Sequence, residues 1–75
     1  MNKERRKMIE RGRDLAIDAK ELIDIALEEE QSCYDNLPEG IQESERGCEM
    51  EENIETLQGV SGYLEDAISD LEEIS

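Results

Sequence analysis

The stretch that decides the fold is residues 50–71, which read MEENIETLQGVSGYLEDAISDL. Its apolar or small residues recur every three or four positions, at Met50, Ile54, Leu57, Ser61, Leu64, Ile68 and Leu71. This spacing is the a/d pattern of a helix that packs along one stripe against another helix. Acidic residues occupy many of the remaining positions, so the pattern predicts a long amphipathic helix over residues 44–74.

The first half of the chain follows the same rule. A second a/d row is formed by Met8, Gly12, Leu15, Ala19, Leu22, Ala26 and Cys33. It predicts a helix over about residues 3–34 that packs on the C-terminal helix through this row. Four further apolar residues lie beside the row or outside it, namely Ile17, Ile23, Leu27 and Tyr34. Because one partner helix cannot cover both sets, we expect these four residues to form an oligomer interface.

A turn separates the two predicted helices. The only proline of the chain, Pro38, lies in the sequence DNLPEG. Proline interrupts a helix interior but fits the first turn of a new helix, and Asp35 or Asn36 can cap the residues that follow. We therefore expect a turn over residues 35–43. The expected fold is all-α, an antiparallel two-helix hairpin that forms one domain over residues 1–75.

The turn also predicts which residues face each other. In a hairpin whose turn is centred near Gly40, two residues lie opposite each other on the two helices when their numbers add to about 81. Such pairs are Ala26 with Ile54, Leu22 with Gly59, and Ala19 with Gly62. A lone hairpin leaves much apolar surface in water, and a chain of 75 residues builds only a small core. We therefore expect a homodimer in which two hairpins form a four-helix bundle.

The composition argues against several classes of protein. Charged residues make up 40% of the chain, and His, Phe and Trp are absent. The chain contains no Gly-rich phosphate loop, no EF-hand loop and none of the Glu-x-x-His pairs of carboxylate-bridged metal sites. We therefore expect no enzymatic activity, no metal and no cofactor. Because no apolar segment resembles a signal peptide or a membrane span, we expect a cytoplasmic protein that does not contact membranes.

The two cysteines, Cys33 and Cys48, leave two possibilities open. In the predicted pairing they lie roughly level across the turn, where a disulfide is geometrically conceivable. In the cytoplasm, two reduced thiols near a loop are the favoured interpretation.

Charge is the most informative feature of the sequence. The net charge is −14, but residues 1–13 hold six basic and two acidic residues, whereas residues 14–75 hold two basic and twenty acidic ones. The basic end could contact nucleic acid. We favour its neutralisation by the acidic residues at the end of the second helix, namely Glu65, Asp66, Asp70, Glu72 and Glu73. The molecule as a whole should repel phosphate, so we expect no direct binding of nucleic acid.

The acidic surface has two interpretations. Rows of carboxylates on a rigid helix can occupy a basic groove that otherwise holds a nucleic-acid backbone. The commoner role of such residues is to keep a small helical bundle soluble, and we give this interpretation the greater weight.

The sequence around the turn resembles a known group of proteins. Residues 35–47 read DNLPEGIQESERG, and MEENI follows at residues 50–54. They are similar to small acidic hypothetical proteins of phages and mobile elements of Gram-positive bacteria, which carry a DNLP-x-x-x-Q-x-SERG turn before a glutamate-rich helix. The resemblance covers roughly residues 22–74, and that family has no settled activity. It implies a phage or mobile-element setting, where very small acidic proteins often block host factors or defence systems.

Three functions follow as hypotheses. The first is a phage-type protein-interaction module in the host cytoplasm that inhibits a host or defence protein with a basic surface. Its expected partner-binding residues are Gln42, Ser44, Arg46, Glu51, Glu52 and Glu55. The second is a structural or regulatory homo-oligomerisation module, and the third is a sponge that binds a signalling nucleotide between two Arg46 side chains. A purely structural role of the turn is equally open, with Ser44 as a helix cap and Arg46 paired with Glu43 or Glu49.

Overall fold

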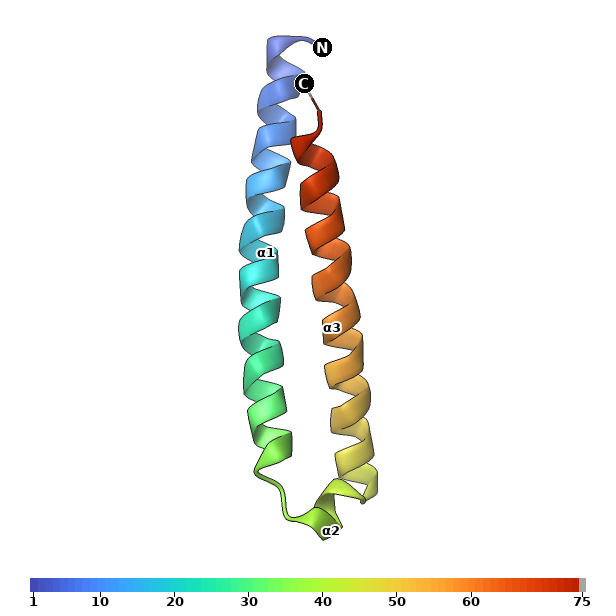
Figure 1. Ribbon diagram of the computed structural model, residues 1–75. Coiled ribbons are helices and arrows are strands. Elements are labelled where there is room, and N and C mark those ends of the chain that lie inside the picture. Colours follow the sequence, from blue (N-terminus) through green and yellow to red (C-terminus); the bar gives the residue numbers. More distant parts are fainter. Residues whose placement is uncertain (75) are drawn as a thin grey trace.

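The computed structural model describes residues 1–74, which form three helices and no strand within that range. The helices are α1 (Lys3–Asp35), α2 (Glu39–Gln42) and α3 (Glu45–Glu72). The long helices α1 and α3 lie side by side and antiparallel, with α2 joining them at one end and both chain termini at the other (Figure 1). The predicted all-α class is therefore confirmed, and the two long helices occupy nearly the expected ranges.

Each long helix begins at a residue whose side chain caps it. The Asn2 side chain accepts a hydrogen bond from the Arg5 backbone N–H at 2.8 Å, and Ser44 Oγ accepts one from the Gly47 N–H at 3.4 Å. These bonds satisfy backbone groups that a helix start leaves without partners. The cap expected from Asp35 or Asn36 does not form, because Asp35 still belongs to α1 and α2 begins after Pro38 without a side-chain cap.

The hairpin is a thin rod that encloses almost no core. Its Cα atoms span 58 × 14 × 14 Å, and its radius of gyration is 17.1 Å. A compact domain of this length has a radius of gyration of about 11 Å. Among the apolar side chains of the described residues, only Ile54 is buried, at 7% exposure. The remaining apolar contacts between α1 and α3 are half-buried because two helices cannot surround a side chain.

The pairing of the two helices differs from the predicted one by about one helical turn. Tyr34 Oη donates a hydrogen bond to Glu51 Oε1 at 2.6 Å, and Ser61 Oγ donates one to Asp24 Oδ1. In both pairs the residue numbers add to 85, so Ile54 lies level with Gln31 instead of Ala26. The predicted pairing was wrong because α2 lengthens the connection and moves its centre beyond Gly40.

The face that α3 turns toward α1 was predicted correctly. Its a/d row consists of Met50, Ile54, Leu57, Ser61, Leu64, Ile68 and Leu71, and every member is buried or half-buried. The apolar spacing in residues 50–71 therefore identified the packed stripe of this helix.

The face that α1 turns toward α3 was predicted one residue out of place. The half-buried row, called the inner row below, consists of Ile9, Arg13, Ala16, Lys20, Ile23, Leu27, Glu30 and Tyr34. The six residues called the outer row are Met8, Gly12, Leu15, Ala19, Leu22 and Ala26, and five of them are exposed. The prediction failed because the inner row includes the charged residues Arg13, Lys20 and Glu30, which are half-buried at the helix contact and which a search for apolar spacing passes over.

The four residues expected at an oligomer interface lie on the α3 side of α1. Ile17, Ile23, Leu27 and Tyr34 are all half-buried within a single chain. Leu27 borders one hollow together with Gln58 of α3, and Tyr34 donates its hydrogen bond to Glu51. The surplus apolar surface of the hairpin therefore lies elsewhere, on the outer row.

Candidate interaction surfaces

The polar residues of the turn hold the two long helices together. Gln42 Nε2 donates a hydrogen bond to the Tyr34 backbone carbonyl at 2.9 Å, near the end of α1. Ser44 caps α3 and also donates a hydrogen bond from its hydroxyl to the Ile41 carbonyl. Two of the predicted partner-binding residues, Gln42 and Ser44, are thus engaged inside the turn.

Gly47 is a key residue of the turn that sequence reasoning did not single out. It is buried, and a Cβ atom at this position would lie 2.1 Å from the Gln42 carbonyl oxygen and 2.6 Å from the Ile41 carbonyl oxygen. Only glycine lets the first turn of α3 approach the backbone of α2 so closely. The available signal was the glycine that ends the SERG sequence, three residues after the Ser44 cap.

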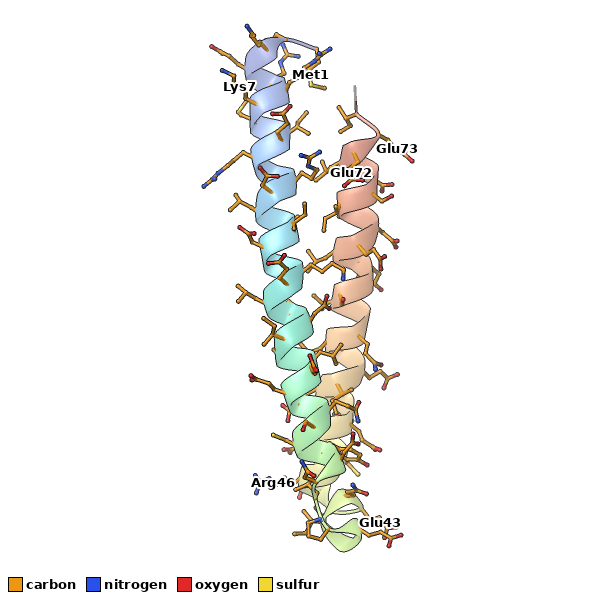
Figure 2. All side chains as sticks on the ribbon, turned by 60° about the vertical axis from the view of Figure 1, so that its left-hand side comes forward. Met1, Lys7, Glu43, Arg46, Glu72 and Glu73 are labelled. Carbon is orange, nitrogen blue, oxygen red and sulfur yellow. The ribbon has the colours of Figure 1, made fainter. Side chains whose placement is uncertain are left out.

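Arg46 is the one predicted turn residue that is free to meet a partner. It is exposed, and it makes no ion pair within residues 1–74, so the alternative of a pairing with Glu43 or Glu49 is not realised. Figure 2 shows Arg46 and Glu43 on opposite sides of the turn. A single exposed guanidinium beside many carboxylates is a weak site for an anionic ligand.

The predicted acidic residues of α3 lie on its surface near the turn. Glu51, Glu52 and Glu55 are all exposed. Glu51 accepts the hydrogen bond of Tyr34, and this bond, with smaller contributions from burial and nearby charges, raises the pKa of Tyr34 from 10 to about 12. Glu52 and Glu55 make no hydrogen bond or ion pair within the described residues and are available to a partner.

The acidic surface extends far beyond these three residues. Within residues 14–74 there are twenty acidic side chains, of which only Asp24 and Glu30 are half-buried and the other eighteen are exposed. Lys20, one of the two basic residues of this segment, is held by Asp24 at 2.7 Å. Almost all the charged side chains exposed from the middle of the hairpin to the turn are therefore acidic.

The polar cluster at mid-length joins the two helices. Asp24 accepts hydrogen bonds from Lys20 on its own helix and from Ser61 on α3. The bond from Lys20, then that from Ser61, lowers the pKa of Asp24, and the bond to Asp24 raises the pKa of Lys20. The cluster selects the observed pairing of α1 with α3, since Asp24 would lose Ser61 after a one-turn shift.

The basic end of α1 lies beside the acidic end of α3, as Lys7 and the pair Glu72 and Glu73 show in Figure 2. Arg6 and Arg13 border a hollow of about 250 Å³ together with Glu72. Direct pairing across the helices is nevertheless absent from residues 1–74, where the ion pairs are Arg13 with Asp14 and Lys20 with Asp24. Most of the basic side chains thus remain exposed to solvent.

The second candidate surface is apolar. Met8, Leu15, Leu22 and Ile25 are exposed by 65%, 52%, 68% and 55%. Met8, Leu15 and Leu22 belong to the outer row, about 100° around α1 from the inner row, and Ile25 lies further round the helix. Scattered single apolar residues are common on protein surfaces, but a continuous line of them marks an interaction site.

The cysteines form no disulfide. Cys33 and Cys48 are both free and exposed. In the observed pairing they lie about one helical turn out of level, because Cys33 is level with Glu52.

The described residues show no centre for metal chemistry. Within residues 1–74, no three metal-ligating side chains gather at one place. The helices of this segment also lack the combination of length and apolar character that a membrane span needs.

Fold and surface together define a helical hairpin with an acidic face and an apolar outer row. Comparison with protein-family models, with curated proteins and with solved structures found no match to the chain.

Proposed function

We propose that this protein is a small interaction module whose acidic rod binds a basic surface of another protein. The observation that carries the proposal is the exposure of eighteen carboxylates over residues 14–74, with Arg46 as the one cation of that segment that makes no ion pair. Rigid helices hold these carboxylates in place before binding, which lowers the entropic cost of association. Complementary charge would speed the encounter and select basic partners.

The charge density of the rod favours, as the partner, a protein surface that normally binds one nucleic-acid strand. A net charge of −14 over the 58 Å rod corresponds to about one charge per 4 Å. One strand of nucleic acid carries a charge every ~3.4 Å and a duplex one every ~1.7 Å. The rod would therefore compete for a basic groove that holds a strand backbone, and its binding would inhibit the protein that owns the groove.

The resemblance of residues 35–47 to phage and mobile-element proteins supports a host or defence protein as the partner. In this proposal the chain acts in the host cytoplasm, and Arg46, Glu52 and Glu55 offer the free side chains nearest the turn.

The test compares two variants that remove the same charge from opposite ends of α3. One carries Glu52→Gln and Glu55→Gln, and the other carries Asp66→Asn and Asp70→Asn. Each is immobilised beside the wild type, and a basic partner captured from the native host is eluted with a salt gradient. We expect the wild-type complex to weaken steeply with salt, because counterion release drives binding. We expect the first variant to lose more affinity than the second, because its charges lie beside the turn, where the free side chains of the proposed contact gather. Binding that is unchanged between 50 and 500 mM salt would contradict the proposal.

A second candidate function, homo-oligomerisation, is favoured by a separate observation. Within residues 1–74, Ile54 is the one buried apolar side chain, while Met8, Leu15 and Leu22 are exposed by more than half. Two hairpins that cover these residues would form a four-helix bundle with a proper interior. Sedimentation at micromolar concentration tests this candidate, and a folded monomer would contradict it.

A further inference from the structure

We infer that the outer row of α1 is the surface on which a second copy of this chain docks, with its own α1 running in the opposite direction. The inference deepens the second proposed function, because it names the face, the orientation and the facing residues. Four observations carry it: the spacing of the row, its alternation of large and small residues, the charge gradient of α1, and the excess surface of the single chain.

The outer row is a complete helix-packing stripe that α3 leaves uncovered except at Ala19, which is half-buried. Its members are spaced 4, 3, 4, 3 and 4 residues apart, and none is charged. Each precedes an inner-row residue by one position, so the two rows lie about 100° apart around the helix. This is close to the right angle between the two neighbours of a helix in a square four-helix bundle. α1 is therefore able to pack on α3 and on a second helix at the same time.

Two outer rows that run in opposite directions are complementary in shape. Large residues, Met8, Leu15 and Leu22, alternate with small ones, Gly12, Ala19 and Ala26. In an antiparallel pair centred near Ile17, Met8 lies opposite Ala26, Leu15 opposite Ala19, and Leu22 opposite Gly12. Each large side chain then meets a small one, which lets the helices approach closely and leaves few voids. A parallel pair in level register would stack large on large and small on small.

The charges of α1 favour the same orientation. Residues 1–13 hold six basic and two acidic residues, while residues 21–33 hold five acidic residues and no basic one. The antiparallel pair places these two segments of different copies side by side, whereas a parallel pair places like charges together. The gradient also opposes the dipole of α1, which disfavours cations near the helix start and anions near its end. The stability of α1 alone does not explain this gradient. The acidic end of α3 lies beside the basic segment within one chain (Figure 2), and the antiparallel partner would add the acidic residues 21–33 of its own α1 to this segment.

The single chain exposes enough surface for such a dimer. Its accessible area is 5828 Å², against about 4,700 Å² for a compact monomer of 8.6 kDa. The excess of about 1,100 Å² is larger than the roughly 800 Å² that each partner buries in a standard interface.

Crosslinking tests the orientation directly. In a chain with Cys33→Ser and Cys48→Ser, one variant carries Met8→Cys and another carries Ala26→Cys. We expect the mixture of the two to form a mixed disulfide under mild oxidation, while Met8→Cys alone crosslinks slowly. Rapid crosslinking of Met8→Cys with itself would contradict the antiparallel arrangement. If the chain sediments as a dimer but neither variant nor the mixture crosslinks, the outer row is not the dimer interface.

Substitution tests the face independently. We expect Leu22→Glu to weaken association by about 100-fold or more, tenfold for each of its two copies in the dimer. Tyr63→Glu is the matched control, because Tyr63 is 77% exposed on α3 and lies off the proposed face. Equal weakening by both variants would contradict the inference. Should Leu22→Glu also unfold the chain, the crosslinking result decides.

These outcomes are distinct from those of the proposed functions. A monomeric wild type would exclude self-association altogether. A dimer that fails both tests would exclude only the outer row as its interface. Neither result bears on the salt-dependent capture of a basic protein.

Discussion

At the scale of single residues, the turn depends on close contact between backbones. Gly47 lies against the carbonyl groups of Ile41 and Gln42, where a Cβ atom has no room. Gln42 and Ser44 add hydrogen bonds that join the end of α1, α2 and the start of α3. The turn is thus fixed by specific contacts, and these determine how α1 packs on α3.

Gly47→Ala should therefore destabilise the hairpin by about 1–3 kcal/mol, because the added methyl group forces α2 away from α3. The matched control is Gly59→Ala, since beyond the nearby backbone of its own helix a Cβ at that position meets nothing within 4 Å. This control should stabilise α3 by up to about 1 kcal/mol, because alanine favours helix over glycine. Urea unfolding followed by circular dichroism at one fixed protein concentration measures both. A gain for Gly47→Ala would show that α2 does not pack as described.

The contact of Tyr34 with Glu51 should be visible in a pH titration. In a Tyr63→Phe chain, Tyr34 is the remaining tyrosine, and its pKa should lie at about 12 because it donates a hydrogen bond to a carboxylate. The raised pKa means that the contact stabilises the fold fully below pH 10, the usual tyrosine value, and that its contribution is lost as the pH rises through 12. Tyrosinate absorbance measures the titration, with circular dichroism as the check on folding.

Adding Glu51→Gln to this chain should lower the pKa of Tyr34, because the charge that opposes ionisation is removed. The same pKa in both chains would show that the contact is absent in solution.

At the scale of elements, α1 and α3 carry charge that does not suit isolated helices. The last turn of each helix contains no basic residue, and α3 ends among Asp70, Glu72 and Glu73. Carboxylates near a helix C-terminus oppose the helix dipole. The stability of these helices therefore depends on packing between them more than on their local charges.

Two charge-reversal variants measure how much these carboxylates lower the free energy of unfolding. Asp70→Lys should stabilise the hairpin by about 0.5–1 kcal/mol, because it places a cation near the end of α3. Glu45→Lys should destabilise it by a similar amount, because Glu45 lies in the first turn, where an anion is favoured. Both variants change the net charge equally. The difference between their unfolding free energies therefore gives the contribution of the helix dipole to stability. Equal shifts would indicate that overall charge repulsion dominates.

At the scale of the whole molecule, the hairpin offers little interior of its own. Ile54 is the one buried apolar side chain of residues 1–74, and the rod is far less compact than a globular domain of its length. Small chains with so little core generally need a partner, a metal or disulfides. In the dimer proposed above, a second copy of the chain would supply this missing interior.

The proposed dimer should accordingly make stability depend on concentration. The thermal midpoint of the wild type should rise over a tenfold increase in protein, because association favours the folded state. The Leu22→Glu variant should show no such rise. A wild-type midpoint that stays constant would agree with a folded monomer and contradict the dimer.

The sequence by itself determined the class of fold, the position of the turn, the packed stripe of α3 and the separation of charge along the chain. Each of these depends on local properties, namely apolar spacing, proline and residue charge, which are readable before any helix meets another. The Ser44 cap was equally readable, because the capping bond spans only three residues.

The tertiary structure alone decided which of two rows on α1 faces α3, the level at which the helices meet, and the need for glycine at position 47. The two rows of α1 differ by a single residue, and the inner row contains Arg13, Lys20 and Glu30, so hydrophobic spacing pointed to the wrong one. The choice follows from contacts between helices, such as Ser61 with Asp24 and Tyr34 with Glu51. Such contacts join residues far apart in the chain, and local patterns carry no information about them.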